Sequence, residues 1–223
     1  PFREYTTGKP FIERLVIRFY QNEKELIAAL SRREIESANT ITPAAARTLE
    51  ERGFRVERTP LPRVFAVFFN QNQSPILAEK EVRQALSLAT EGKTLVQNVL
   101  ESFGIPIDGP LPPLLLEERE TIAETKTLEA RLEEANTLLE KAKWKLNPKT
   151  AIREKTKGKE TIPLSFSLAT SDVLELKESA ELLREMWRKI GADVTVQIFG
   201  SGGLNQNVIR PRRYDALLFG EII

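Results

Sequence analysis

The sequence predicts an α/β protein in which one mixed β-sheet is flanked by helices, with residues 1–223 forming a single domain. Three observations predict this class. Segments with the apolar period of a strand alternate with segments that have the apolar period of a helix. No stretch between them has the composition of a linker, and no internal repeat is visible. Because 41% of the residues are hydrophobic, the chain also has enough material for a sizeable core.

The first quarter of the chain is predicted to contain two helices between short strands. Residues 11–20 place apolar and charged side chains on opposite sides, as in a half-buried strand. Asn22 begins a helix with a capping box, and Thr42 is placed to cap a second helix that starts with Pro43. Gly53 is expected to end that second helix. The further strands expected in this part cover residues 35–41 and 54–59.

The most apolar stretch of the chain, residues 63–70, predicts a central strand that is covered on both faces. Two helices are expected after it, from about Glu79 to Thr90 and from Lys93 to Leu100. Six glycines and prolines then occur among residues 104–113. That density predicts a long loop, and loops of this length often line a site.

The second half of the chain is predicted to continue the alternation of helix and strand. Residues 127–145 have apolar side chains at spacings of three and four, which predicts an amphipathic helix. Residues 172–190 show the clearest helical pattern of the chain, and Gly191 is expected to end that helix. The remaining elements expected here are strands over residues 161–169, 194–199 and 214–219, and a Gly-rich turn with a short helix over residues 200–214.

The composition excludes several kinds of chemistry. The sequence has no histidine and no cysteine, which excludes Cys/His zinc sites, iron–sulfur clusters, His-dependent nucleophiles and disulfides. The four aspartates are scattered along the chain, which argues against a carboxylate metal cage. The 33 basic and 32 acidic residues give a net charge of +1, too small for bulk electrostatic binding of nucleic acid. We therefore expect no cofactor, no metal, no nucleic acid and no enzymatic activity.

Several polar motifs have both a functional and a structural interpretation. The basic cluster at residues 141–159 could contact nucleic acid or an anionic membrane, but a mobile hairpin or loop in solvent also explains it. The arginines within residues 210–213 suit either an anion or the end of a short helix. The glycines within residues 200–203 lack the lysine of a phosphate loop, which favours a simple turn. The adjacent glutamates at 117–118 and 133–134 point in different directions, which disfavours glycoside hydrolysis.

Eight short segments follow the pattern of a known family, and the most specific is the helix at residues 81–89, Glu-Val-Arg-Gln-Ala-Leu-Ser-Leu-Ala. The other seven are residues 8–19, 33–36, 67–70, 109–113, 138–139, 190–194 and 214–220. Together and in this order they resemble the extracellular solute-binding proteins of family 5, the peptide-binding and nickel-binding components that feed ABC transporters. The sequence departs from the family pattern at Arg33, where the family has glycine, and at Glu221, where it has tryptophan.

The resemblance implies an architecture and a set of partners. The chain would be the C-terminal lobe of a periplasmic-binding-protein type II-like clamp, a fragment of a longer two-lobed protein. Its partners would be a peptide or other small solute, the N-terminal lobe of the same protein and an ABC transporter permease. The protein would be a monomer, extracytoplasmic in the periplasm or anchored to the membrane at the outer cell surface. Two alternatives stay open, namely another solute such as a chelated metal or a sugar, and a sensor or scaffold that does not transport.

Six residues are candidate ligand contacts. Asn70 and Asn72 follow the most apolar strand, where amides can bond a ligand in the crevice at a strand end. Loop amides that bond their own backbone explain the same two residues about as well. The other four candidates lie in the Pro-rich loop, Leu111 and Pro112, and at the end of the last strand, Gly220 and Glu221. An acidic group at Glu221 could bind an amine or indicate a different solute.

Overall fold

The computed structural model describes residues 8, 11–39, 41–57, 63–107, 109 and 126–222. The chain forms two compact units, Pro1–Glu57 and Arg58–Ile223. Among the described residues, the first unit contains helices only, and the second contains both sheets together with further helices. That both units belong to one lobe stays a prediction.

Two short helices make up the regular structure of the first unit, α1 (Glu23–Ser31) and α2 (Pro43–Glu51). Both predicted caps are confirmed. The Asn22 side chain accepts a hydrogen bond from the backbone N–H of Glu25 at 2.9 Å, and Thr42 Oγ1 accepts one from the first turn of α2 at 3.3 Å. Thr42 Oγ1 also donates to the Glu23 carboxylate at 3.0 Å. Side-chain capping therefore both starts the two helices and joins their N-terminal ends.

The three strands predicted for the first unit do not occur in its described residues. Residues 11–20 are irregular, and the apolar side chains of Phe11, Leu15, Ile17 and Phe19 are exposed. Residues 35–39 and 41 and residues 54–57 are also without strand, while residues 40, 58 and 59 lie outside the described part of the chain. The predictions are wrong because alternation shows only that a segment could bury one face, and not that another strand lies beside it. A strand also needs a neighbour for its backbone N–H and C=O groups.

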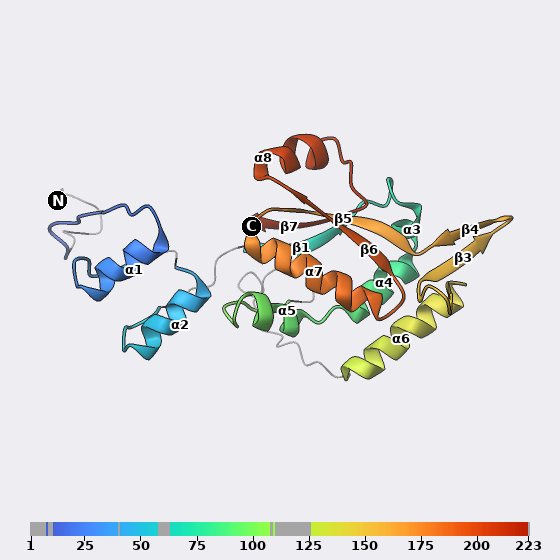
Figure 1. Cartoon of the computed structure of the whole chain (residues 1–223), viewed down its shortest axis with the longest axis horizontal. Helices are drawn as coiled ribbons and strands as arrows, with labels where there is room; N and C mark the ends of the chain where they lie inside the picture. The colour runs from blue at the N-terminus through green and yellow to red at the C-terminus, as the bar shows by residue number, and fades with distance from the viewer. Residues whose placement is uncertain are drawn as a thin grey trace. The chain divides into compact units, whose positions relative to one another are not determined.

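The second unit is built on a four-stranded mixed sheet, as predicted. Strand β7 runs antiparallel to β1 and parallel to β5, and β5 runs parallel to β6 (Figure 1). The strands, in the order in which they lie in the sheet, are β1 (Arg63–Phe69), β7 (Ala216–Ile222), β5 (Ser165–Ser171) and β6 (Asp193–Phe199). The first and last strands of this unit are therefore neighbours.

Strand β1 lies at the end of this sheet, so the prediction of a central strand is wrong. Among the described residues it pairs with β7 alone. Its apolar residues do contact both sides: Val67 and Phe69 pack on the main core, and Val64 is buried on the opposite face. Phe65 and Phe68 remain partly exposed. A continuous apolar run therefore indicated contact on both faces of the strand, but it could not indicate how many strands flank it.

Helices cover both faces of the main sheet. Five helices lie between β1 and β6 along the chain. They are α3 (Pro75–Ala78), α4 (Lys80–Ala89), α5 (Gly92–Val99), α6 (Leu128–Lys141) and α7 (Leu174–Arg188). The main core lies between the sheet and helices α4, α6 and α7, and it includes the buried Trp187. The opposite face is covered by α8 (Ser201–Gly203) and a π-helix (Leu204–Ile209), through Leu204 and Val208 (Figure 1). The helices predicted over residues 79–90, 93–100 and 172–190 are confirmed, and the helix predicted over residues 127–145 is present but ends earlier than expected, at Lys141.

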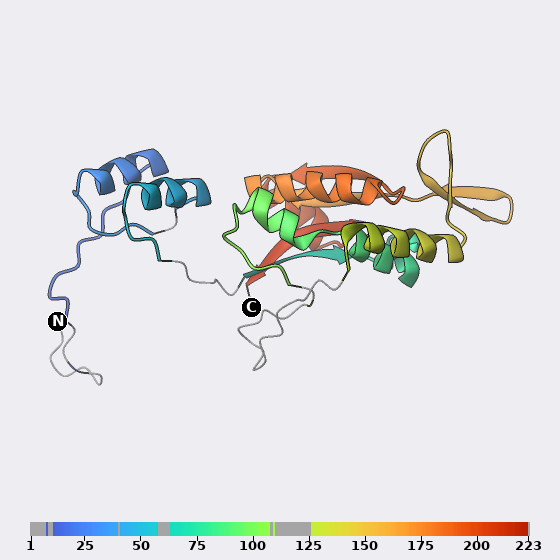
Figure 2. The same ribbon diagram turned by 90° about the horizontal axis from the view of Figure 1, so that it is seen from below.

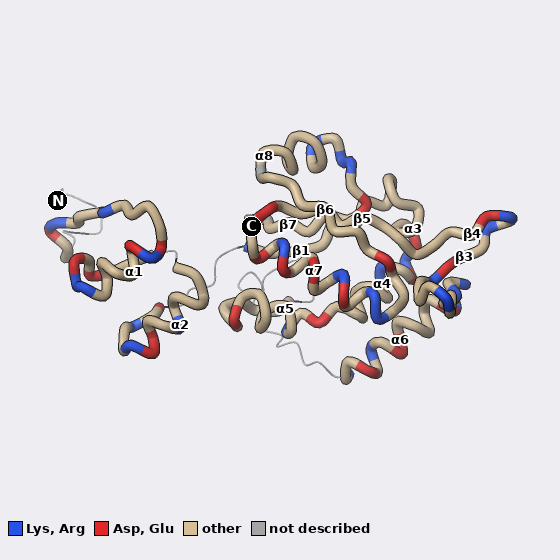
Figure 3. The backbone as a smooth tube through the Cα atoms, viewed as in Figure 1, with Lys and Arg blue, Asp and Glu red and all other residues tan. Residues whose placement is uncertain are grey.

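The basic cluster at residues 141–159 forms most of a second, antiparallel sheet with the order β2 (Lys145–Leu146), β3 (Arg153–Lys157) and β4 (Glu160–Pro163). The predicted hairpin is confirmed for β3 and β4, which project from the main sheet (Figure 2). The simple picture of a solvated loop is wrong at Trp144 and Arg153, which are both buried. Lysines and glutamates both lie on this sheet (Figure 3), so it is not a uniformly basic surface.

The strand predicted over residues 161–169 is divided between the two sheets at Leu164. The backbone N–H of Leu164 donates to Arg153 in the small sheet at 2.7 Å, and its carbonyl accepts from Asp193 in the main sheet at 2.9 Å. Its side chain is fully buried in the main core. One buried residue therefore ends β4 and leads into β5, a change of partner that alternation along the chain cannot indicate.

Candidate functional site

The carboxyl ends of the three parallel strands β5, β6 and β7 meet at one edge of the main sheet, where β1 begins. We call this the carboxyl edge and define it by the terminal residues Arg63, Ser171, Phe199 and Ile222. In open α/β sheets, ligands bind outside this end of the strands. The carboxyl edge is therefore the first place to examine for a binding site.

Two side chains of β1 lie directly against Gly220 at this edge. It lies opposite Phe65 in the β1–β7 register. A Cβ atom placed on Gly220 would come within 2.8 Å of Phe65 Cε1 and 3.0 Å of Arg63 Nε. The guanidinium carbon of Arg63 lies 4.6 Å from the centroid of the Phe65 ring, a cation–π contact. Only glycine lets this aromatic ring and this cation approach the β7 backbone so closely.

Asp172 places a carboxylate at the same edge, directly after β5. Its backbone N–H donates to the carbonyl of Phe199 at 2.9 Å, so the β5–β6 pairing continues to this point. The Asp172 carboxylate lies 3.9 Å from where a Cβ atom on Gly200 would be, and the residue is exposed. A cation beside Gly220 of β7 and an anion beside Gly200, which directly follows β6, therefore lie along one edge of the sheet.

Exposed apolar side chains surround these two charges. They come from β1, β6 and the start of α7, and they are Phe65, Ile198, Val173 and Leu174. This combination of apolar area with a few polar groups is typical of a binding site. The carboxyl edge as described holds no nucleophile beside a base, and the described residues contain no group of three or more acidic residues that could hold a metal ion. The arrangement is suited to holding a ligand.

The candidates Asn70 and Asn72 lie at the opposite edge of the sheet. The Asn70 side chain donates to the carbonyl of Arg212 at 2.8 Å, and the Asn70 backbone N–H donates to the carbonyl of Asp215 at 2.8 Å. Asn72 is exposed in the turn that follows. Since Ala216 pairs with Phe69 and Gly220 with Phe65, about four residues of strand, roughly 14 Å, separate the two edges. The hydrogen bonds of Asn70 thus connect the C-terminal end of β1 to the segment that leads into β7.

The other four candidates divide between the carboxyl edge and the undescribed part of the chain. Gly220 and Glu221 lie in β7 at the carboxyl edge, with the Glu221 backbone opposite Val64. Leu111 and Pro112 lie outside the described residues. Arg63, Phe65 and Asp172 were missed by sequence reasoning because their proximity depends on strand order and register. The only sequence signal was a glycine in one partner strand and a glycine directly after the other, and its meaning is clear only once the strands are paired.

Asp215, which belongs to one of the family-like segments, has a structural role. Its Oδ2 accepts hydrogen bonds from the backbone N–H of Ser167 at 2.9 Å and from the Ser167 hydroxyl at 2.8 Å. The carboxylate thereby continues the β5–β7 pairing beyond the last backbone pair, Leu168 with Ala216. Asp215 holds the two parallel strands together at the edge opposite the candidate site.

We expect Asp215→Ala to lower the free energy of unfolding by about 2 kcal/mol, because it leaves the half-buried N–H of Ser167 without its acceptor. Asp215→Asn keeps an acceptor oxygen and loses only the charge, so it should cost about 1 kcal/mol. Urea titrations followed by circular dichroism measure both values. Equal stability of the two variants would show that the side-chain hydrogen bonds contribute nothing.

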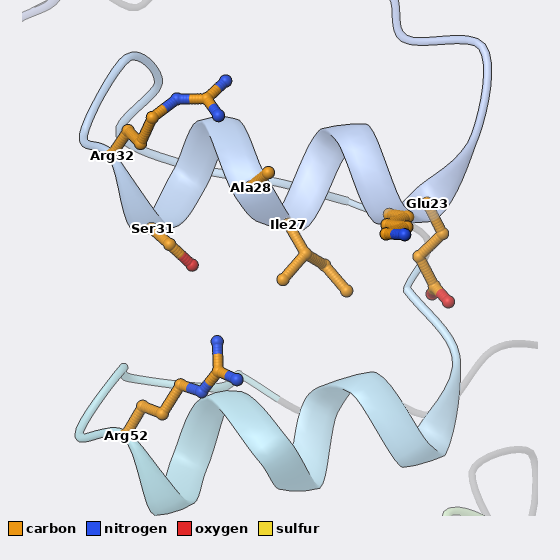
Figure 4. A pocket seen from close by; sticks show the side chains of 7 residues that line it. Glu23, Ile27, Ala28, Ser31, Arg32 and Arg52 are labelled. Atoms are coloured by element: carbon orange, nitrogen blue, oxygen red, sulfur yellow. The ribbon is translucent and has the colours of Figure 1, made fainter.

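Two hollows elsewhere lack the features of the carboxyl edge. One of about 570 Å³ lies between α1 and α2 (Figure 4), where Ile27 and Ser31 point toward α2 while Arg32 points away from it. Arg32 instead donates to Glu34 at 2.7 Å, and this hydrogen bond lowers the pKa of Glu34. The second, of about 450 Å³, lies between α5 and α7, and three of the residues that line it are glutamates of α7. The first hollow has the basic residues Lys24, Arg32 and Arg52 in its lining, whereas Lys177 is the one basic residue among those that line the second.

Comparison with known proteins gives the family. The sequence profile described as "Bacterial extracellular solute-binding proteins, family 5 Middle" matches residues 1–222. The oligopeptide-binding protein AppA of Bacillus subtilis (strain 168) is 26% identical over 220 residues, which are 97% of this chain and 39% of AppA. The solved structure of AppA in complex with a nonapeptide matches with a TM-score of 0.70 and 23% identity, covering 90% of this chain and 39% of that one.

Two further solved structures share the fold. The ABC transporter substrate-binding protein CtaP of Listeria monocytogenes has a TM-score of 0.75 at 20% identity, covering 99% of this chain and 42% of CtaP. NikA from Brucella suis, in complex with Fe(III)-EDTA, has a TM-score of 0.68 at 20% identity, covering 91% of this chain and 40% of NikA. This chain thus spans about two fifths of the length of these relatives. None of the helices in its described part is long and apolar enough to cross a membrane.

These matches confirm the predicted periplasmic-binding-protein type II-like α/β fold, with a mixed sheet flanked by helices. Because the family profile covers residues 1–222, the chain belongs to the bacterial extracellular solute-binding proteins of family 5.

Proposed function

We propose that the protein to which this chain contributes binds oligopeptides outside the cytoplasm and delivers them, as a monomer, to an ABC transporter permease. The observation that carries the proposal is the carboxyl edge, where an exposed cation, an exposed carboxylate and apolar side chains lie together. A peptide offers the complementary groups, namely a carboxylate, an ammonium group and apolar side chains. The 26% identity to an oligopeptide-binding protein supports the same ligand class.

The mechanism we propose is closure of two lobes around the ligand. A solute that contacts both lobes stabilises the closed state by the free energy of those contacts, so binding and closure are coupled. This chain would supply one set of contacts, including Gly220 and Glu221, and the N-terminal lobe would supply the other. Each 1.4 kcal/mol of contact energy corresponds to about tenfold in affinity. The chain alone should therefore bind peptide orders of magnitude more weakly than the complete protein.

A second ligand class is a metal chelate. NikA shares the fold and was solved with Fe(III)-EDTA, a polycarboxylate. The Arg63 guanidinium could bind a carboxylate of such a chelate as readily as one of a peptide. The carboxylate of Asp172 at the same edge disfavours a ligand that is negative throughout, so we place peptides first.

The test is to identify what the complete protein carries. The protein, purified gently and without added ligand from its expression host, is denatured, and the released small molecules are identified by mass spectrometry. We expect a ladder of short peptides, which should be missing from an unrelated protein prepared in the same way. A bound chelate, a sugar or no solute would contradict peptide binding. A turnover screen of the same preparation should find no peptide hydrolysis, since the described edge lacks a catalytic pair.

A further inference from the structure

We infer that the small sheet is a docking surface for an anionic phospholipid membrane, to which its lysines bind electrostatically. The inference goes beyond the proposed function, because it concerns a part of the second unit away from the carboxyl edge and holds for any solute. The surface, which we call the lysine end, consists of the exposed lysines at the end of α6 and on the small sheet with its turns. They are Lys141, Lys143, Lys145, Lys149, Lys157 and Lys159.

The first argument is that the lysine end carries an excess of positive charge (Figure 3). None of its six lysines forms an ion pair with another residue of the described ranges. The neighbouring Lys155 differs, because its ammonium group lies 2.9 Å from both carboxylate oxygens of Glu79. Two acids of the small sheet, Glu154 and Glu160, lie opposite Lys145 and Lys157 in the strand register and offset part of the charge. The surface stays positive, with six lysines against two glutamates.

The second argument is that these lysines are carried by an anchored support that projects from the main sheet (Figure 2). Buried Arg153 in β3 donates to the carbonyls of Ile190 and Trp144 and to the side chain of Asn136. The indole N–H of Trp144 donates to the carboxylate of Glu79 at 3.0 Å. The lysines are therefore presented together on a supported sheet, and less conformational entropy is lost when they meet a charged surface.

The third argument concerns the kind of partner. The ammonium group of lysine is a point charge without the directional fork of arginine, so six of them suit a surface with many anionic groups more than a single bound anion. Clusters of basic residues are attracted to anionic lipids in this way. Binding of nucleic acid would call for exposed aromatic side chains that stack on bases, and the one aromatic residue among residues 141–159, Trp144, is buried.

The fourth argument is that membrane docking leaves the candidate binding site free. Leu164 connects the small sheet to the start of β5, and β5 ends at the carboxyl edge. The seven residues of β5 span roughly 20 Å. The lysine end and the carboxyl edge therefore lie at opposite ends of this strand, so a membrane that contacts one does not cover the other.

The test measures binding of the complete polypeptide, prepared without any covalent lipid, to vesicles that are then sedimented. No solute is added. Vesicles of phosphatidylcholine and phosphatidylglycerol in equal parts are compared with vesicles of phosphatidylcholine alone at about 0.15 M salt. We expect the wild-type protein to bind only the anionic vesicles. It should leave them at about 1 M salt, where the Debye length falls from about 8 to about 3 Å.

Variants locate the contact. Each lysine close to an anionic surface contributes up to about fivefold to the affinity. The double variant Lys157→Gln with Lys159→Gln should therefore bind anionic vesicles about tenfold more weakly, and replacement of all six lysines by glutamine should abolish binding. The matched control, Lys93→Gln with Lys177→Gln, makes the same change in net charge on α5 and α7 and should alter the affinity by less than about twofold. All variants should keep the wild-type melting temperature, because substitutions of surface lysines have little effect on stability.

Two results would overturn the inference: wild-type protein that binds neither kind of vesicle, or a six-lysine variant that binds anionic vesicles as well as the wild-type protein does. A third would also do so. If only phosphatidylcholine vesicles that contain the permease retain the protein, and the six lysines are needed for this, the partner is an acidic protein surface. Each of these outcomes leaves the proposed function standing, since that function is tested separately by the solutes released from the complete protein.

Discussion

Replacing Trp187 with alanine should lower the free energy of unfolding by about 3–5 kcal/mol, the usual cost of deleting a fully buried aromatic side chain. Trp187 lies in α7, has 1% of its surface exposed, and contacts the rings of Phe69 and Phe166 at 6.4 and 5.8 Å between centroids. Its indole N–H donates to the carbonyl of Leu86 and to Thr90 Oγ1, both at 3.0 Å. One side chain thus joins α7 to α4, β1 and β5.

A conservative variant separates the contribution of the aromatic ring to stability from that of the indole N–H donor. Trp187→Phe keeps an aromatic ring but removes the N–H donor, so it should cost less than the alanine variant, about 1–3 kcal/mol. Both variants are compared with the wild-type chain by urea unfolding followed by far-ultraviolet circular dichroism, which does not depend on tryptophan fluorescence. A loss below about 1 kcal/mol for Trp187→Ala would contradict the packing described for the main core.

Replacing Arg153 with methionine should destabilise the second unit by about 2–4 kcal/mol, although the volume of the side chain is nearly preserved. Arg153 is 3% exposed, and its guanidinium donates to the carbonyls of Ile190 and Trp144 and to the side chain of Asn136 at 2.7–3.0 Å. A carboxylate oxygen of Glu140 lies 3.6 Å from it. Methionine would leave these buried acceptors without donors, which costs more than the hydrogen bonds contribute on balance.

Arg153→Met should also loosen the attachment of the small sheet to helices α6 and α7. Arg153 lies in β3, while its partners lie in or next to α6 and α7, so hydrogen exchange should accelerate most over residues 145–163. Lys157→Met provides the control, because Lys157 is exposed in the same strand and should change stability by less than about 0.5 kcal/mol. If Arg153→Met and Lys157→Met behave alike, the buried hydrogen bonds do not anchor this sheet.

Local features of the structure could be predicted well from the sequence. Asn22 and Thr42 cap their helices as expected, because capping depends only on a side chain and the next three residues. Gly191 follows α7 with a positive φ of 81°, as expected for the residue that ends a helix. The apolar stripe of α7 is buried as predicted, including Leu183 and Trp187. Each of these predictions needs information from only a few neighbouring residues.

Several predictions that required knowledge of a partner failed. Residues 11–20 have the alternation of a strand, but they have no strand partner among the described residues. Residues 63–70 have the composition of a central strand, yet β1 lies at the end of the sheet. Arg153 appeared as one basic residue in a charged segment, and its burial became visible only with α6 and α7 packed around it. Strand order and burial of charge depend on segments that are far apart along the chain.

The sequence by itself determined the α/β class, the helix boundaries to within a few residues, the lack of His- and Cys-based chemistry, and the resemblance to family 5 that the profile match bears out. Only the tertiary structure decided which side chains share an edge. Asn70 and Gly220 were both candidates, but the antiparallel register of β1 and β7 places them at opposite ends of the sheet. The same register places Arg63 and Phe65 on Gly220. The physical reason is that helix periodicity and capping are local, whereas register is set by hydrogen bonds between strands that here are about 150 residues apart.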